Sequence, residues 1–283
     1  IGHKKTNIKD VDLVVYSSAV SLDNIEIQEA KNNNIPYIKR AEMLGELLKV
    51  KKNSIAVAGT HGKTTTTSML GVILNASDID PTIVVGGIVQ GFKTNSIFGK
   101  GDTIVVEADE YDKTLLSLKP NMSIVTNIDL EHIDCYPNIE VLKETFLIFL
   151  NSIPFFGINI ICYDDENIRS IIKDIKRPYI KYGSSSECDV RYENPRFQEF
   201  RSSYDLIIND NLMSRIDLEV PGEHNILNSL AAICIALEMG VSIDTIKNSL
   251  LKYKGVERRF EIKHTTPDNN LIIDDYAHHP SEI

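Results

Sequence analysis

Cysteine is scarce in this sequence of 283 residues, and the four that occur lie far apart. They are Cys135, Cys162, Cys188 and Cys234, and no two of them form a Cys-x-x-Cys pair. Scattered cysteines are typical of free thiols in a reducing compartment rather than of a disulfide framework. The sequence therefore predicts unpaired thiols and a cytoplasmic location.

Long apolar runs and an excess of basic charge are also missing. No apolar run approaches the roughly 20 residues that a membrane helix needs, and no signal peptide is visible, although the chain begins at Ile1 rather than Met. The formal net charge is −10, which disfavours nucleic acid as the main partner because counterion release requires a basic surface. An anionic small ligand in a local positive pocket stays compatible with that charge. We therefore expect no membrane insertion and no nucleic-acid partner.

Apolar runs alternate with helical patterns along most of the chain. We expect strands at 11–18, 36–38, 55–58, 82–85, 103–106, 123–126 and 159–162. We expect helices at 24–32, 40–48, 63–75, 140–151, 166–173, 225–239 and 243–251. This alternation is typical of a parallel sheet. Between 179 and 220 the pattern changes to short alternating strands, which predicts antiparallel ribbons at the sheet edge.

Two glycines, a lysine and several threonines follow the expected strand 55–58. The segment consists of Gly59, Thr60, His61, Gly62, Lys63, Thr64 and Thr65. Glycines let a loop approach an anion closely, and the following helix N-terminus favours negative charge. Lys63 would then contact the outer phosphates of a nucleotide, and Thr64 would offer its hydroxyl to Mg²⁺. Val57 occupies the first glycine position of the general phosphate-loop spacing, so a tight turn with an exposed lysine is the alternative.

Acidic residues follow two further strands. TIVVEADEYD (103–112) ends in Glu107, Asp109, Glu110 and Asp112, and Glu107 is the best metal candidate because it comes first after the apolar run. SIVTNIDLEHIDCY (123–136) places His132 among carboxylates, which suits a metal ligand or a phosphate contact. The alternatives are a solvated acidic loop and a structural histidine.

Six motifs in order resemble the Mur ligases, the ATP-dependent amide-forming enzymes of peptidoglycan precursor synthesis. They are GTHGKTTTT, EADE, TNIDLEHID, PGEHNILNSLAA, GVERRFE and DDYAHHPSE. SSAVSLDN and RAEML are closest to members that add L-alanine to UDP-N-acetylmuramate through an acyl phosphate. EADEYD is typical of a related ligase that attaches a tripeptide to the same sugar nucleotide. The resemblance implies ATP and Mg²⁺ as cofactors, and UDP-N-acetylmuramate and L-alanine as substrates.

The resemblance also implies a domain order. We predict an α/β fold whose central domain has a P-loop-type parallel sheet with added antiparallel strands. Part of a Rossmann-like domain precedes it, and the start of a third domain follows. The expected ranges are 1–50 for UDP-sugar binding, 51–264 for ATP binding, and 265–283 for the truncated beginning of the amino-acid-binding domain.

Site residues carried over from the family extend beyond the loop. The implied catalytic residues are Lys63, Glu107, His132 and Arg259, and the implied metal ligands are Thr64, Glu107 and His132. The implied nucleotide contacts outside the loop are Asn225, Asn228, Arg259 and Asp275. The candidate substrate contacts are His3, Ser17, Ser18, Arg40, Tyr276 and His278.

Several of these residues have simpler alternatives. Asn225 and Asn228 can read the edge of a heterocycle, but Asn225 is also a plausible helix cap. Arg258 and Arg259 on a presumed strand would point to opposite faces, so that one reaches a phosphate, unless they form a surface ion pair. Arg40 can pair with Glu42 or Glu46 on the surface, and His278 can be an ordinary loop residue.

A second class of function is a nucleotide-dependent switch protein with the same phosphate loop. No stretch of the sequence marks switch segments, and the carboxylates around His132 have no purpose in such a protein. We therefore favour the ligase interpretation.

Overall fold

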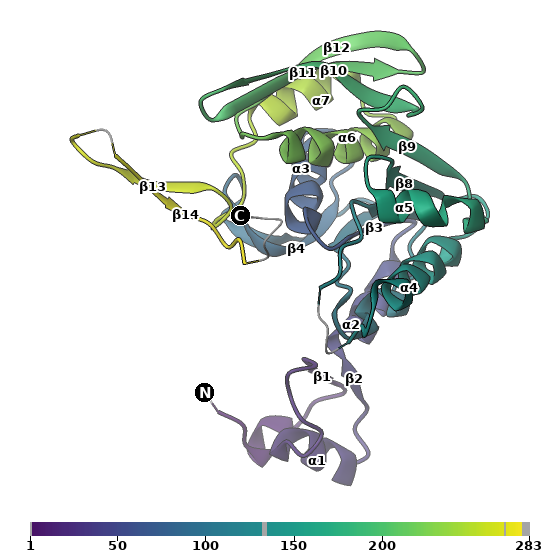
Figure 1. Cartoon of the computed structure of the whole chain (residues 1–283). Helices are drawn as coiled ribbons and strands as arrows, with labels where there is room; N and C mark the ends of the chain where they lie inside the picture. Colours follow the sequence, from purple (N-terminus) through teal and green to yellow (C-terminus); the bar gives the residue numbers. More distant parts are fainter. Residues whose placement is uncertain (1, 132–134, 269, 279–283) are drawn as a thin grey trace.

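The structure is a computed structural model, and it describes residues 2–131, 135–268 and 270–278 (Figure 1). Its helices are η1 (Lys5–Ile8), α1 (Ile25–Asn32), α2 (Arg40–Val50), α3 (Lys63–Asn75), η2 (Tyr111–Ser117), α4 (Ile139–Ser152), α5 (Glu166–Ile171), η3 (Ile172–Asp174), α6 (Glu223–Glu238) and α7 (Ile243–Leu251). Those labelled η are 3-10 helices.

The strands of the central sheet include those that precede the glycine-containing loop 59–62 and the two acidic segments. They are β3 (Asn53–Ala58), β4 (Thr82–Val89), β5 (Thr94–Ile97), β6 (Thr103–Glu107), β7 (Met122–Val125), β8 (Ile158–Cys162), β9 (Tyr179–Gly183), β10 (Val190–Gln198), β11 (Arg201–Ile208) and β12 (Asn211–Leu218). Two small sheets stand apart from it, formed by β1 (Val14–Tyr16) with β2 (Tyr37–Lys39) and by β13 (Glu261–Thr265) with β14 (Leu271–Asp274).

The central sheet has ten strands in the order β12-β11-β10-β9-β8-β7-β3-β6-β4-β5. The strands from β10 to β4 run parallel, whereas β11, β12 and β5 pair antiparallel at the two ends. The expected α/β fold with added antiparallel strands is therefore confirmed. β5 was not predicted, because its sequence TNSI has only one apolar residue and no alternating pattern.

The chain winds in two directions from β3. The connection through α3 leads toward β4, while those through α4 and α5 lead from β7 toward β9 on the other side. Because such crossovers are right-handed, the two sets of helices cover opposite faces of the sheet. α3 packs against α6 and α7, and α4 lies across the sheet from them (Figure 1). A change of winding direction of this kind creates a crevice at the carboxyl ends of the central strands.

Apolar strands and helix faces form one continuous core around β3. Ile55, Ala56, Val57 and Ala58 are fully buried, as expected for a strand covered by helices on both faces. Polar side chains inside this core pair with one another: Ser123 donates to the side-chain oxygen of Asn159 at 2.6 Å. None of the four cysteines, all within the described ranges, forms a disulfide. Within the described ranges, no helix is long and apolar enough to cross a bilayer.

Two expectations about strands were wrong. The predicted strand 11–18 is limited to β1, because β2 is its single pairing partner and a turn closed by the bond from Val20 N–H to the Ser17 carbonyl follows it. Arg258 and Arg259 do not lie on a strand. They belong to a turn in which Arg258 has φ +60° and Phe260 has φ +48°, so the extended backbone of β13 begins only at Glu261.

Replacement of a core aromatic residue in α4 tests this packing. Phe146→Ala removes a fully buried ring, and we expect a loss of about 3–5 kcal/mol in the free energy of unfolding. The matched control is Ile148→Ala on the same helix, where 52% exposure predicts a change within about 0.5 kcal/mol. Urea unfolding followed by circular dichroism measures both, and equal losses would contradict the assigned faces of α4.

Candidate functional site

The candidate site lies where the winding direction changes, at the carboxyl ends of β3, β6 and β7. Residues 59–62 connect β3 to α3, and the acidic segment that begins at Glu107 follows β6. A further segment, residues 126–131, follows β7. Because β3 lies between β6 and β7 in the sheet, the three segments meet at one edge. The sheet order therefore brings together residues 69 positions apart in the sequence, such as Thr60 and Asp129.

Two glycines give the loop its shape. Gly59 has φ +136° and Gly62 has φ +81°, conformations that residues with a side chain rarely adopt. A Cβ at Gly59 would lie 2.0 Å from Oγ1 of Thr126, and one at Gly62 would lie 2.5 Å from Oδ1 of Asn228. Gly62 is also the N-cap of α3, so the cap residue has no side chain that could accept from the first amides of that helix. Its first amides thus remain suited to an anion.

The segment after β7 holds the loop in place. Asn127 accepts from Thr60 N–H with its carbonyl at 3.2 Å and from His61 N–H with its side-chain oxygen at 2.7 Å. Thr126 and the Asn127 amide both donate to the His61 carbonyl. The Thr60 hydroxyl donates to the Asp129 carbonyl at 3.0 Å and accepts from its N–H at 2.9 Å. These bonds make the loop rigid without using the helix N-terminus.

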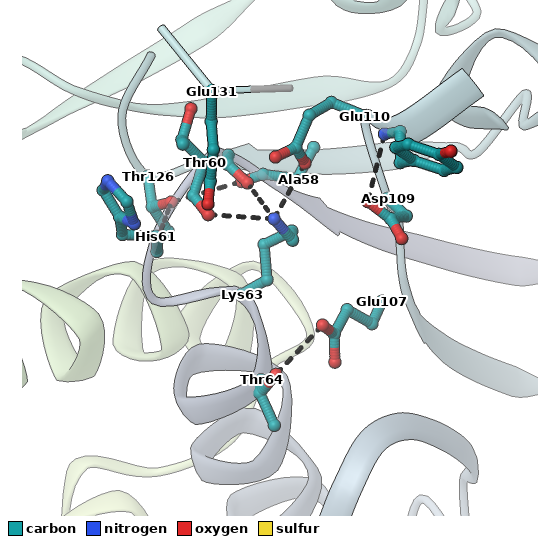
Figure 2. Close-up of polar contacts among 12 residues, drawn as sticks. Ala58, Thr60, His61, Lys63, Thr64, Glu107, Asp109, Glu110, Thr126 and Glu131 are labelled. Atoms are coloured by element: carbon teal, nitrogen blue, oxygen red, sulfur yellow. Dashed lines mark hydrogen bonds and ion pairs between the residues drawn. The ribbon is translucent and has the colours of Figure 1, made fainter. Parts of the chain in front are cut away.

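Lys63 is the cation at the centre of the site. Its ammonium donates to the carbonyls of Gly59 at 2.6 Å and Thr60 at 2.9 Å, and to Oε2 of Glu110 at 2.8 Å. Figure 2 shows the Lys63 side chain directed toward these groups. The side chains of Lys63 and Glu110 are 14% and 1% exposed. Burial raises the pKa of Glu110, and the charge of Lys63 acts in the opposite direction.

Thr64 and Glu107 form the second half of the site. The Thr64 hydroxyl donates to Oε1 of Glu107 at 2.9 Å (Figure 2). The Gly86 N–H donates to Oε2 of the same carboxylate at 2.7 Å. A hydroxyl and a carboxylate are hard oxygen donors, and Mg²⁺ typically binds one or two carboxylates together with phosphate oxygens and water. The two side chains therefore fit the predicted magnesium site. No group of three acidic, histidine or cysteine side chains suited to a metal occurs among the described residues.

His132, the third predicted metal ligand, lies outside the described residues. Its neighbour Glu131 is described, and Oε1 of Glu131 lies 3.4 Å from Nε2 of His278. His61 approaches the same segment, with Nε2 3.5 Å from Oδ2 of Asp129. Thr65, the last predicted residue of the loop, is the third residue of α3.

Asn225 and Asn228 lie at the start of α6, beside the loop. Both are buried, and the Asn228 amide lies 3.5 Å from Oδ1 of Asn225. Oδ1 of Asn228 accepts from the Thr66 hydroxyl at 3.2 Å, which places it against α3. The alternative that Asn225 caps the helix is wrong, because Gly222 is the N-cap and the Asn225 amide donates to the Pro221 carbonyl.

The turn around Arg259 corrects a second expectation. The two guanidinium groups do not point to opposite faces, since that of Arg258 lies 5.1 Å and that of Arg259 lies 5.6 Å from the ring centre of Tyr276. Asp275 fixes this turn by accepting from Phe260 N–H at 2.7 Å and from Ala277 N–H at 2.7 Å. The turn follows Val256, whose side chain lies beside Gly87, as does that of Thr64. Arg259, Asp275, Tyr276 and His278 therefore form one cluster near the end of β4.

The N-terminal candidates divide into two groups. A small pocket is lined by Ser17, Ser18, Lys39, Arg40, Ala41, Asp109, Tyr111 and Thr114. It joins three of the predicted substrate residues to the acidic segment after β6. His3 is elsewhere: its Nδ1 lies 2.7 Å from Oε2 of Glu26, which α1 provides.

Two residues of the site were not singled out from the sequence. Asn127 is the second residue after β7, and the carboxylates beyond it were favoured instead. For Glu110, as for Asp109 and Asp112, the alternative to a functional role was a place in a solvated acidic loop. Its side chain is instead buried against Lys63. The available signal was that Glu110 lies near the end of an apolar strand, but the sequence does not distinguish it from Asp109.

Comparisons with known proteins agree with this architecture. Residues 57–236 match the Mur ligase middle domain, and residues 1–52 match the Mur ligase family, catalytic domain. A UDP-N-acetylmuramate–L-alanine ligase of Pelobacter propionicus is 47% identical over the whole chain, which spans 61% of that relative.

Solved structures resemble the chain in the same way. The crystal structure of UDP-N-acetylmuramate–alanine ligase from Thermotoga maritima has a TM-score of 0.86 at 30% identity, and the match covers 100% of this chain and 64% of that one. A murein peptide ligase from Psychrobacter arcticus has a TM-score of 0.82 at 27% identity, covering 99% of this chain and 63% of that one.

The pair formed by Lys63 and Glu110 predicts a pH-dependent stability change. Lys63→Met leaves a buried carboxylate without its cation, so we expect a loss of about 3–5 kcal/mol in the free energy of unfolding at pH 7.5. The substitution also raises the pKa of Glu110 further, because the opposing charge is gone. A folded-state pKa above the unfolded one stabilises the protein at low pH and loses that effect as pH rises.

We therefore expect the loss to be smaller at pH 5.5 than at pH 7.5, as measured by urea unfolding of wild type and variant at both values. The control is the double variant Lys63→Met/Glu110→Gln, whose difference from wild type should vary less with pH because no buried carboxylate is left to titrate. A single variant with the same loss at both pH values would contradict a buried, ionised Glu110.

Proposed function

The chain belongs to the Mur ligase family, and from this premise we propose that it performs the nucleotide-dependent step of an amide-forming ligase. The proposed reaction joins L-alanine to the lactyl carboxylate of UDP-N-acetylmuramate with hydrolysis of ATP to ADP and phosphate, in peptidoglycan precursor synthesis. The names of the relatives support this choice of substrates. The free thiols support a cytoplasmic location.

The observation that carries the proposal is the convergence of Lys63, Thr64 and Glu107 on one rigid loop. Phosphoryl transfer requires little covalent chemistry from a protein, so catalysis depends on positioning and on neutralising charge. Lys63 supplies a cation, and the uncapped start of α3 supplies backbone N–H groups for phosphate oxygens. Thr64 and Glu107 are the described residues that would hold Mg²⁺, which would neutralise charge on the transferred phosphoryl group.

A carboxylate has to be activated before an amine can form an amide with it, because its own leaving group, hydroxide, is poor. Transfer of the γ-phosphoryl group to the lactyl carboxylate gives an acyl phosphate and ADP. The amine of L-alanine then attacks the acyl carbon, and phosphate leaves from the tetrahedral intermediate. In this scheme Lys63 and Arg259 neutralise phosphate charge, and no side chain forms a covalent intermediate.

The remaining predicted contacts are assigned around this centre. Asn225 and Asn228 would bind the adenine, since their buried amides adjoin the loop at Gly62. Ser17, Ser18 and Arg40 would bind the UDP-sugar in the small pocket that also includes Asp109 and Tyr111.

The proposed domain boundaries remain those predicted from the sequence, 1–50, 51–264 and 265–283. The small sheet of β1 and β2 falls in the first range, the ten-stranded sheet in the second. In the third range, Tyr276 and His278 would adjoin the amino acid. Asp275, in the same range, holds the turn that carries Arg259 of the second range.

A ligase that attaches a tripeptide is the second candidate, and Tyr111 favours it. This residue gives the EADEYD sequence and lines the pocket beside Arg40. The structural likeness to a murein peptide ligase is compatible with it. The two candidates share every residue of the nucleotide site and differ in the attacking amine.

A phosphate-release assay on the product of the complete gene separates them. With ATP, Mg²⁺ and UDP-N-acetylmuramate present, we expect release to depend on L-alanine and not on the tripeptide L-alanyl-γ-D-glutamyl-meso-diaminopimelate. Lys63→Ala should lower the turnover rate at least about 10²-fold, because a donor to developing charge is removed. The control is Lys173→Ala, an exposed lysine on η3 that should leave the rate unchanged.

Release with the tripeptide alone would overturn the choice of amine. Turnover of ATP with no dependence on UDP-N-acetylmuramate would overturn the ligase assignment and favour a nucleotide switch.

A further inference from the structure

Glu110 has no role in the reaction described above, yet it is the charged partner of Lys63. We propose that Glu110 is a positioning residue that competes with the phosphates of a bound nucleotide for the Lys63 ammonium. This inference rests on the proposed function, because it concerns the same nucleotide site. It assigns to the buried carboxylate a control over how tightly that nucleotide binds.

The first observation is that protein oxygens satisfy the whole ammonium group. An ammonium has three hydrogen-bond donors. Three acceptors lie within 2.9 Å of Nζ of Lys63, namely the carbonyls of Gly59 and Thr60 and Oε2 of Glu110. A direct bond from Lys63 to a phosphate oxygen therefore requires at least one of these contacts to be given up.

Glu110 is the only charged one of these three acceptors, so its replacement by a phosphate oxygen leaves a buried carboxylate without its cation. The two carbonyls belong to the loop that would surround the phosphate, and they are neutral. The Glu110 carboxylate carries the same sign of charge as phosphate, and with 1% exposure it is little screened by water. Lys63 can neutralise either anion well, but neutralising both weakens its effect on each.

The backbone of Glu110 is fixed where it stands. Its carbonyl accepts from the hydroxyl of Tyr136 at 2.5 Å and from Lys113 N–H at 3.0 Å. Tyr136 is fully buried, so this part of the segment is anchored in the core. The carboxylate therefore stays beside Lys63 when the ammonium turns toward a phosphate, and it continues to compete for that ammonium.

The other acidic residues of the same segment have different partners. Glu107 accepts from Thr64 and from Gly86 N–H, and Asp109 accepts from Tyr111 N–H at 3.1 Å. Of these three carboxylates, all within the described part of the chain, only that of Glu110 pairs with Lys63. The role proposed here is thus specific to one of three neighbouring carboxylates.

Calorimetric titration with the β,γ-imido analogue of ATP and Mg²⁺ tests the proposal in the chain itself. Glu110→Gln keeps the size of the side chain and one acceptor oxygen but removes the charge. We expect its Kd for the analogue to fall at least about fivefold below that of wild type. The control Asp102→Asn removes one exposed charge just before β6, at the end of that strand away from the loop, and should leave the Kd unchanged.

A double-mutant cycle separates competition for Lys63 from a general effect of charge or structure. In the Lys63→Met background, adding Glu110→Gln should change the Kd less than twofold, since there is no ammonium to compete for. An equal improvement in both backgrounds would overturn the proposal. If Glu110→Gln does not fold, Glu110→Asp replaces it. This shorter carboxylate loosens the bond to Lys63 and should lower the Kd by a smaller factor, whereas an unchanged Kd would overturn the proposal.

The outcome also distinguishes this inference from the proposed function. A wild-type chain that binds the analogue, with Lys63→Met weakening it, supports the nucleotide site. If the nucleotide site is supported in this way but the Kd of Glu110→Gln is equal to or above that of wild type, only the role of Glu110 is overturned. A wild-type chain that does not bind the analogue overturns both.

Discussion

The hydrogen bonds between the loop after β3 and the segment after β7 are the constraint on which the site depends. Thr60 and His61 are tied to Asn127 through backbone and side-chain bonds, so the loop cannot shift relative to the sheet. These bonds use the N–H groups of Thr60 and His61, which precede the helix. The first N–H groups of α3, behind the N-cap Gly62, take no part in them. Rigidity and anion affinity therefore come from different atoms of one short segment.

The fixed position of the loop explains its two glycines and the contacts of Lys63. Gly59 has to be small because Thr126 stands against it, and Gly62 because Asn228 does. Lys63 is then held where its ammonium meets two loop carbonyls and a buried carboxylate. A protein with a formal net charge of −10 thereby places a lysine beside a helix N-terminus, an arrangement that is compatible with the proposed anionic ligand.

The acidic segment after β6 divides its carboxylates among three tasks. Glu107 faces the helix N-terminus through Thr64, Asp109 lies in the pocket shared with Arg40, and Glu110 is buried against Lys63. Side chains close together in the sequence thus face the proposed metal site, the proposed substrate pocket and the lysine. The connection of these three regions through one segment gives the proposed ligase a physical link between its nucleotide and its sugar substrate.

Local signals in the sequence were sufficient for most of the regular structure. The helices Lys63–Asn75 and Ile243–Leu251 have the predicted bounds, because apolar periodicity and the flanking residues that define them lie within each segment. The turn at Arg258 and Arg259 was mispredicted as a strand. It is imposed from a distance, by the Asp275 carboxylate on Phe260 N–H and by Tyr276 N–H on the Arg258 carbonyl.

The sequence by itself therefore determined the phosphate loop, the helix behind it and the acidic strand ends, since glycine conformations and strand or helix patterns depend on near neighbours. Only the tertiary structure decided that Glu110, rather than Asp109 or Glu107, pairs with Lys63, and that Asn127 holds the loop. The physical reason is that strand order sets these contacts. β3 lies between β6 and β7, and that order depends on packing across the whole sheet.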